Sequence, residues 1–171
     1  MRPLVLDGDG LFAVSTLGVA GLALLRARHA PTVLTPHDGE FGLLMGARPG
    51  DDRIAAAREL AGRAGSVVLL KGPTTVVAPP DGHVTLVTHG DQRLATAGSG
   101  DVLTGMLAAA LAQLLDPSTA CQLAAYLHGA AGELADADEG EMSMVAGDIV
   151  SHIGDAVQEL VARERATPRG E

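Results

Sequence analysis

Short apolar runs alternate with helical patterns along this chain of 171 residues. Residues 4–6, 31–34 and 67–70 are predicted strands, and the last run is apolar at every position, as in strands buried on both faces. Apolar residues recur at helical spacing after each run. We therefore expect an α/β fold in which a mainly parallel sheet carries helices on both faces, with residues 1–171 in a single domain.

The other predicted elements extend this pattern. Residues 74–78 and 84–88 flank Pro-Pro-Asp-Gly, which predicts a β-hairpin. One helix should begin at Thr35, with this residue as its N-cap and Pro36 in the first turn. Further helices are expected over residues 11–28, 52–63, 102–115, 118–135 and 146–165, followed by a frayed tail at residues 166–171.

The chain is acidic, and this limits its partners. It has 12 basic and 21 acidic residues and a formal net charge of -9, which argues against binding to nucleic acid or to an anionic membrane. The uncharged stretches at residues 11–25 and 102–115 are too short and too rich in small residues to span a membrane. We see no secretion signal, and the single cysteine, Cys121, fits a buried thiol in a reducing compartment. A cytoplasmic protein is expected.

Four segments with chemically useful residues follow predicted strands. They contain Asp7, His37, Lys71 and the loop at Gly98. Ligands of α/β proteins bind beyond the carboxyl ends of the strands, so these segments should meet at one edge of the sheet.

The loop at Gly98 has the composition of an anion site. Gly98, Ser99 and Gly100 precede a predicted helix whose first N–H groups lack partners, so a phosphoryl group could bind to the backbone there. Asp101 in the same loop could take a proton from a hydroxyl that attacks phosphorus. Alternatively, Ser99 or Asp101 caps the helix and the glycines only turn the chain.

Two further segments contain candidate ligand contacts. Lys71 ends a buried strand and could hold a nucleotide phosphate or ribose, unless its side chain extends into solvent. In the segment at residues 35–40, helix capping accounts for Thr35, Pro36 and Asp38 but not for His37 and Glu40. These two residues could meet a substrate and a hydrated Mg²⁺, respectively, although a solvated helix face also explains Glu40.

Residues 7–12, Asp-Gly-Asp-Gly-Leu-Phe, suggest a different function. An Asp-x-Asp pair after a strand resembles the nucleophile motif of haloacid-dehalogenase-type phosphatases, in which the first Asp is phosphorylated and the second is the acid. Leu11 stands where that motif has a hydroxyl residue, and this alternative leaves the Gly98 loop without a role. His128 lies on a mostly apolar predicted helix, where a packed and hydrogen-bonded histidine is expected.

Five segments in this order resemble a known family. They are D-G-D-G-L from residue 7, T-P-H-D-G-E from 35, K-G-P-T-T from 71, L-A-T-A-G-S-G-D-V-L-T-G from 94 and A-A-Y-L-H-G from 124. Together they resemble the ADP/ATP-dependent NAD(P)H-hydrate dehydratases, a ribokinase-like family, over nearly the whole chain. The resemblance implies that ADP, or ATP, phosphorylates the hydroxyl of the hydrated nicotinamide ring. Loss of phosphate then regenerates NADH or NADPH, with AMP as the other product from ADP.

The resemblance also implies roles for individual residues. Asp101 matches the base that also contacts the hydrate, and His37 matches a substrate-binding position. Glu40 looks like the metal-linked glutamate, with Mg²⁺ as the metal. The phosphoryl-stabilising loop matches Gly98, Ser99 and Gly100, and the nucleotide contacts match Lys71, Gly72, Pro73, Thr74, Thr75 and Gly100.

This sequence departs from the family pattern. The usual D-A-D-A-L-N lacks its asparagine here, and an asparagine often found before L-A-T is absent from His-Gly-Asp-Gln at residues 89–92. Family members also carry upstream strands and a G-P-G-L-G segment, so the chain resembles the C-terminal part of the domain. We therefore expect an exposed apolar edge, a homo-oligomer or dependence on the other half, and little activity from this chain alone. A non-catalytic nucleotide-binding remnant is a third functional alternative.

Overall fold

A computed structural model describes residues 2–90, 96–113, 115–140 and 143–166. Its single described sheet has five strands in the order β1-β2-β3-β4-β5. The pairs β1–β2 and β2–β3 are parallel, and β3–β4 and β4–β5 are antiparallel, so the predicted hairpin makes the sheet mixed. The strands are β1 (Leu4–Leu6), β2 (Thr32–Leu34), β3 (Val67–Leu70), β4 (Thr75–Ala78) and β5 (Thr85–Val87).

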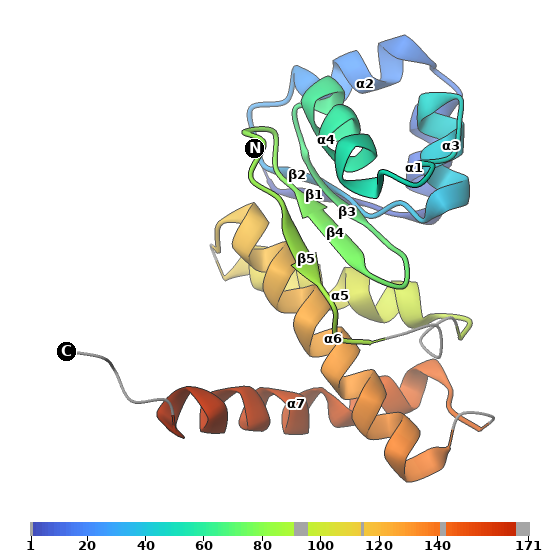
Figure 1. The fold of residues 1–171 in the computed structure, drawn as a ribbon. Helices are drawn as coiled ribbons and strands as arrows, with labels where there is room; N and C mark the ends of the chain where they lie inside the picture. Colours follow the sequence, from blue (N-terminus) through green and yellow to red (C-terminus); the bar gives the residue numbers. More distant parts are fainter. Residues whose placement is uncertain (1, 91–95, 114, 141–142, 167–171) are drawn as a thin grey trace.

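Helices cover both faces of this sheet (Figure 1). Neighbouring strand residues point to opposite faces: Leu34 packs in the core with α1–α4, whereas Val33 packs in the core with α5 and α6. The predicted α/β architecture is therefore confirmed. The helices are α1 (Gly8–Ser15), α2 (Val19–Arg26), α3 (Asp38–Met45), α4 (Arg53–Ala64), α5 (Ser99–Ala112), α6 (Pro117–Glu139) and α7 (Ala146–Ala166).

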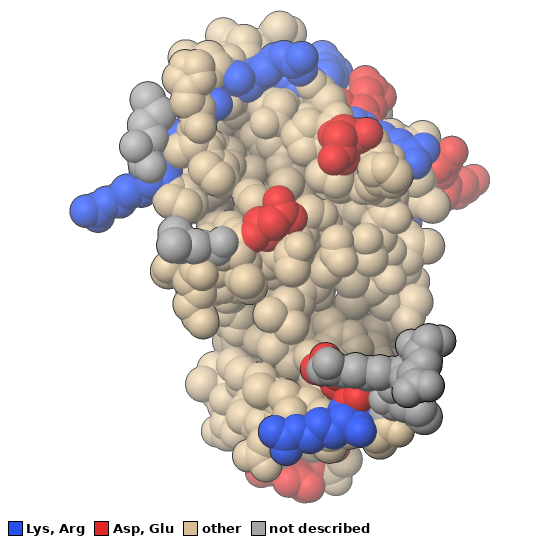
Figure 2. Space-filling view, turned by 90° about the vertical axis from the view of Figure 1, so that its left-hand side faces the viewer, with Lys and Arg blue, Asp and Glu red and all other residues tan. Residues whose placement is uncertain are grey.

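The last helix belongs to a separate apolar cluster. Ile149 and Ala156 of α7 are buried against Leu127 and Ala131 of α6, beyond the end of the sheet. Figure 1 shows α7 crossing the far end of α6. On the face drawn in Figure 2, charged side chains lie mainly toward the upper and lower parts, and the surface between them is mostly uncharged.

Two predicted helices differ from those observed. The helix expected over residues 11–28 is two helices bent by 115°, because the chain turns at Gly18, where φ is 55°. Among the described residues, no single helix is both long and apolar enough to cross a membrane, and α1 and α2 reach that length only as this bent pair. Helix α5 ends at Ala112, and Leu114 lies outside the described residues.

The prediction that Thr35 caps a helix is wrong. Thr35 is fully buried, its N–H donates to the Leu6 carbonyl over 3.0 Å, and the Pro36 carbonyl accepts from the Lys71 N–H over 2.8 Å. These bonds continue the parallel ladder beyond β2, so the helix begins two residues later and His37 becomes its N-cap. The same ladder brings the ends of β1, β2 and β3 to one edge of the sheet.

Strand β1 lies at the open side of the sheet. Within the described residues it pairs with β2 alone, yet its side chains pack on both faces, Val5 toward α5 and α6 and Leu6 toward α1–α4. Cover on both faces is typical of an interior strand of a parallel sheet. Among the described residues, no strand pairs with the edge of β1 that faces away from β2.

Candidate active site

The carboxyl ends of the strands border a cavity of about 640 Å³. This volume is within the range of small-molecule sites. The cavity lies where the two helix layers meet, because His37 comes from the side of α3 and His128 from α6. Its described walls include His37, Asp38, Lys71, Gly72, Pro73, Thr75, His89, Gly90, Thr96, Ser99, Gly100, Leu103, Ala125 and His128.

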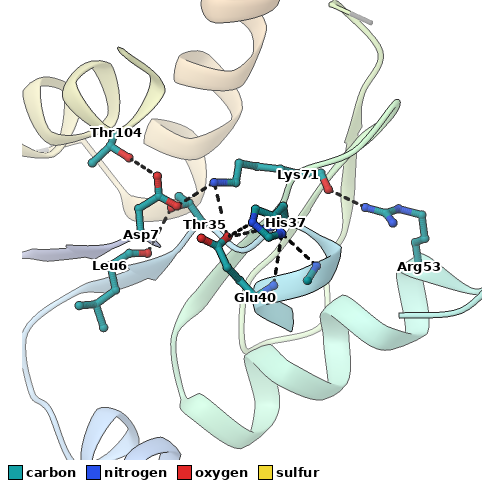
Figure 3. Close-up of polar contacts among 9 residues, drawn as sticks. Leu6, Asp7, Thr35, His37, Glu40, Arg53, Lys71 and Thr104 are labelled. Atoms are coloured by element: carbon teal, nitrogen blue, oxygen red, sulfur yellow. Dashed lines mark hydrogen bonds and ion pairs between the residues drawn. The ribbon is translucent and has the colours of Figure 1, made fainter. Parts of the chain in front are cut away.

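Lys71 is the central charge of this edge (Figure 3). Its Nζ lies 2.7 Å from Asp7 Oδ1 and 3.7 Å from Glu40 Oε2. The second oxygen of Asp7 accepts a hydrogen bond of 3.1 Å from the Thr104 hydroxyl. Strand ends and α5 are therefore joined by a polar network, and Lys71 does not extend freely into solvent.

The Asp7 carboxylate is stabilised in its charged form. Burial by itself raises its pKa, but the hydrogen bond and charge of Lys71, together with the Thr35 and Thr104 hydroxyls, lower the pKa below its ordinary value. The side chains of Lys71 and Asp7 are only 22% and 16% exposed. The Lys71 ammonium is therefore already held in place by the carboxylates of Asp7 and Glu40 when an anion enters the cavity.

The Gly98 loop is placed against this network. Gly98 is the N-cap of α5 with φ of 90°, a left-handed conformation that favours glycine. A Cβ on Gly100 would lie 3.5 Å from Asp7 Oδ2 and 3.7 Å from Lys71 Nζ, so the first turn of α5 approaches the ion pair closely. The interpretation of Ser99 or Asp101 as the helix cap is wrong, because Gly98 occupies that position.

His128 supports the same turn from α6. The ring is 7% exposed, and its Nε2 lies 3.0 Å from the Ser99 carbonyl, so Nε2 carries the proton that it donates. Burial lowers the pKa of His128, the Ser99 bond raises it, and the nearby Lys71 charge lowers it further. The net lowering favours the neutral ring. The prediction of a packed, hydrogen-bonded histidine is confirmed.

Asp101 lies at the surface of this edge. It belongs to the first turn of α5, its side chain is exposed, and it is not among the cavity walls. The carboxylate has no hydrogen bond to another side chain among the described residues. The helix dipole favours a negative charge there, and the exposed carboxylate is accessible to solvent.

His37 and Glu40 have a structural role that the sequence did not suggest. They form a capping box: His37 Nδ1 accepts from the N–H groups of Gly39 and Glu40 over 2.9 and 3.2 Å, and Glu40 Oε2 accepts from the His37 N–H over 2.8 Å. The His37 side chain is still 59% exposed and lines the cavity. Helix capping thus explains both residues, contrary to our expectation.

The segment after β3 is partly in the cavity wall. Lys71, Gly72, Pro73 and Thr75 line it, whereas Thr74 does not. Arg53, which sequence analysis missed, donates from Nη2 to the Lys71 carbonyl over 2.8 Å (Figure 3) and from Nη1 to Asp38 over 2.6 Å. A basic first residue of a helix gives no sequence signal for this contact.

A second missed group lies around His89. Its ring meets Tyr126 edge to face with centroids 4.4 Å apart, and its Nδ1 lies 3.4 Å from Glu133. Glu133 also accepts from the Gly90 N–H over 2.8 Å. Leu94 and Ala95 of the motif lie outside the described residues.

A parallel strand edge, a glycine turn at a helix N-terminus and a held lysine thus meet at one cavity of this α/β fold. The chain belongs to the NAD(P)H-hydrate dehydratase family, because the family model of that description matches residues 1–154. The bifunctional NAD(P)H-hydrate repair enzyme Nnr of Mycobacterium leprae is 47% identical over 160 residues, which cover 92% of this chain and 33% of that protein.

Solved structures agree with this assignment. The ADP/ATP-dependent NAD(P)H-hydrate dehydratase from Bacillus subtilis, co-crystallised with ATP/Mg²⁺, is 36% identical with a TM-score of 0.73, over 77% of this chain and 49% of that chain. A ribokinase-like superfamily protein from Enterococcus faecalis, 20% identical with a TM-score of 0.61 over 92% of this chain and 63% of its own, shows the same fold. The chain spans about a third of the M. leprae protein and half of the B. subtilis one.

The phosphatase alternative finds no support at this site. Asp7 is joined to Lys71 and to Thr104, and Asp9, the acid of that motif, is exposed in the first turn of α1. The family match further assigns residues 1–154 to the dehydratases.

Proposed function

We propose that this chain contributes the nucleotide and phosphoryl site of an ADP-dependent NAD(P)H-hydrate dehydratase. The observation that carries the proposal is the Lys71–Asp7 pair held against Gly100 at the N-terminus of α5, within a cavity of about 640 Å³. A cation and the N-terminus of a helix together attract a phosphoryl group. The co-substrate is ADP or ATP, and the substrate is the hydrate of NADH or NADPH.

In this reaction the hydroxyl oxygen of the hydrate attacks the terminal phosphorus of the nucleotide. Asp101 takes the hydroxyl proton, and with ADP the bond to AMP breaks. Phosphate then leaves with its bonding electron pair, and the adjacent ring carbon loses a proton to water, which forms the ring double bond of NADH or NADPH. Gly98, Ser99 and Gly100 stabilise the transferring group through the helix N-terminus, and Lys71 neutralises charge on the phosphates. His37 contacts the hydrate, and Lys71, Gly72, Pro73, Thr74, Thr75 and Gly100 hold the nucleotide.

Mg²⁺ fits this donor set only as a partly protein-bound ion. No group of three His, Cys, Asp or Glu side chains among the described residues could hold a metal. Mg²⁺ at kinase-like sites is often held by one or two carboxylates together with phosphates and water, and Glu40 with Asp7 can supply those carboxylates. When bound, Mg²⁺ would neutralise charge on the nucleotide phosphates.

We further propose that a strand must pair with the open edge of β1 for full activity. Both faces of β1 are covered while this edge has no strand partner in the described part of the chain, and Asp7 directly follows the strand. Without such a strand, the edge favours self-association, and the isolated chain forms homo-oligomers. We place the enzyme in the cytoplasm, with small molecules as its ligands.

The test is recovery of NADH absorbance from NADH hydrate with ADP. We expect little turnover from this chain alone and turnover once the remaining part of a ribokinase-like domain is supplied, in the same chain or as a separate one. ADP binding without turnover in both forms would identify a non-catalytic remnant. Full activity from a monomer of this chain would contradict the requirement for a further strand.

A further inference from the structure

The carbonyl of Lys71 is held by a residue with no role in the proposed reaction. Arg53 is the first residue of α4, and its guanidinium reaches past the end of β3. Nη2 donates to this carbonyl over 2.8 Å, and Nη1 donates to Asp38 Oδ1 over 2.6 Å. One planar group thus joins the segment after β3 to the first residue of α3, and Figure 3 shows its contact with the Lys71 carbonyl.

The two ends of this contact belong to different parts of the cavity wall. Asp38 follows His37, the residue proposed to meet the hydrate, and Lys71 begins the segment proposed to hold the nucleotide. Lys71 is also held by the Pro36 carbonyl at its N–H and by Asp7 at its Nζ. Arg53 therefore adds a further contact that holds Lys71, the residue proposed to bind the phosphates.

Gly72 independently indicates that the sequence accommodates the contact between Arg53 and the Lys71 carbonyl. A Cβ at Gly72 would collide with the Arg53 guanidinium. Gly72 is not among the described glycines with positive φ, so its backbone conformation does not itself require glycine. The missing side chain leaves room for Arg53 to reach the carbonyl.

The Arg53 guanidinium is largely buried at this place. The Arg53 side chain is 22% exposed, and its Nε is buried without a hydrogen-bond partner among the described residues. An unpaired buried N–H is unfavourable, so the two Nη contacts fix where this group lies. Two bonds from a planar fork set both distance and orientation, which a single ammonium cannot do.

We propose that Arg53 is a positioning residue that sets the segment at Lys71–Thr75 for nucleotide binding and fixes its distance from the His37 turn. The proposal rests on the proposed function, in which residues 71–75 hold ADP. Arg53 acts through the Lys71 carbonyl and Asp38 and does not itself touch the phosphates.

Titration calorimetry with ADP on the full chain tests this role. Arg53→Lys keeps the charge but loses the fork, so we expect binding roughly tenfold weaker or more. The matched control is Arg58→Lys, because Arg58 lies on the same helix and also donates to a backbone carbonyl, that of Gly82 in the hairpin turn, over 3.0 Å. Its ADP affinity should stay within about twofold of the unmodified chain.

A double-mutant cycle separates positioning from loss of stability. Gly72→Ala displaces the guanidinium in the unmodified background and should weaken ADP binding, but it should add little in the Arg53→Lys background because the contact is already lost. Additive losses, or an Arg53→Lys affinity equal to that of Arg58→Lys, overturn the inference and leave the proposed function standing. Absence of ADP binding by the unmodified chain overturns the proposed function and this inference with it.

Discussion

The Lys71 side of the cavity and the first turn of α5 differ in how fully their charged groups are engaged. Lys71 contacts Asp7 and Glu40, and Asp7 also contacts Thr104. Asp101, in contrast, is exposed and has no side-chain partner among the described residues. A group that holds a ligand benefits from being fixed beforehand, whereas a group that accepts a proton must be free to meet it. The difference separates binding residues from a candidate base.

The largest effect on activity should come from a change at Asp101. In an active form of the enzyme, Asp101→Asn should lower kcat by roughly 100- to 10,000-fold, because the amide cannot accept the proton. ADP affinity measured by calorimetry should change little. Asp9→Asn is the matched control, since Asp9 is also an exposed acid in the first turn of a helix at this edge. A variant at Asp101 that keeps half of its rate would remove the base from this mechanism.

Loss of the ion pair between Lys71 and Asp7 should chiefly affect stability. Lys71→Met leaves the Asp7 carboxylate half-buried without its cation, and we expect the free energy of unfolding to fall by about 2 kcal/mol. Urea unfolding measures this change. Adding Asp7→Asn should recover part of the loss, because the uncompensated charge is then removed. Equal stability of Lys71→Met and the unmodified chain would show that the pair contributes nothing.

Acid should weaken the same pair. The pKa of Asp7 is lowered in the folded state from its ordinary value of 3.8, so its contribution is complete above that value and is lost as the pH falls through the lower folded pKa. Unfolding measured between neutral pH and pH about 2 should show this loss. Asp7→Asn should flatten the dependence in the acid range, and an unchanged slope would contradict the assignment.

The smallest effect is expected far from the cavity. His152 on α7 has a raised pKa, because its ring bonds the Asp148 carbonyl over 2.8 Å and Asp138 over 3.1 Å. Its contribution to stability should be complete below the ordinary pKa of 6.5 and be lost as the pH rises through the higher folded value. Unfolding of His152→Gln should lack this dependence while ADP affinity stays unchanged. A change in ADP affinity would link α7 to the cavity.

The sequence predicts the edge of the sheet well because strand ends are local signals. Apolar runs followed by Asp7, Lys71 and the Gly98 loop were sufficient to predict one site, since parallel strands bring their carboxyl ends together. Contacts between distant segments were not predictable. Lys71 and Asp7 are 64 positions apart, and the reach of Arg53 depends on where α4 packs.

The helix caps show a second limit. Ser, Thr, Asp and Asn are the usual N-caps, so Thr35 was the expected one. Tertiary structure overrode this preference, because the ladder from Leu6 and Lys71 extends through Thr35 and Pro36. Histidine is an uncommon cap, and its role at position 37 follows only from the bonds made by its ring.

The cap at His37 also fixes which kind of atom its ring can recognise. Because Nδ1 accepts from two backbone N–H groups, the proton of the neutral ring resides on Nε2. The imidazole therefore presents a donor at Nε2, 3.6 Å from Glu40 Oε2, and a hydroxyl or amide oxygen in the cavity can accept from it. Aspartate at this position would retain an N-cap acceptor but present no N–H donor, so helix initiation and ligand selection can be separated by one substitution.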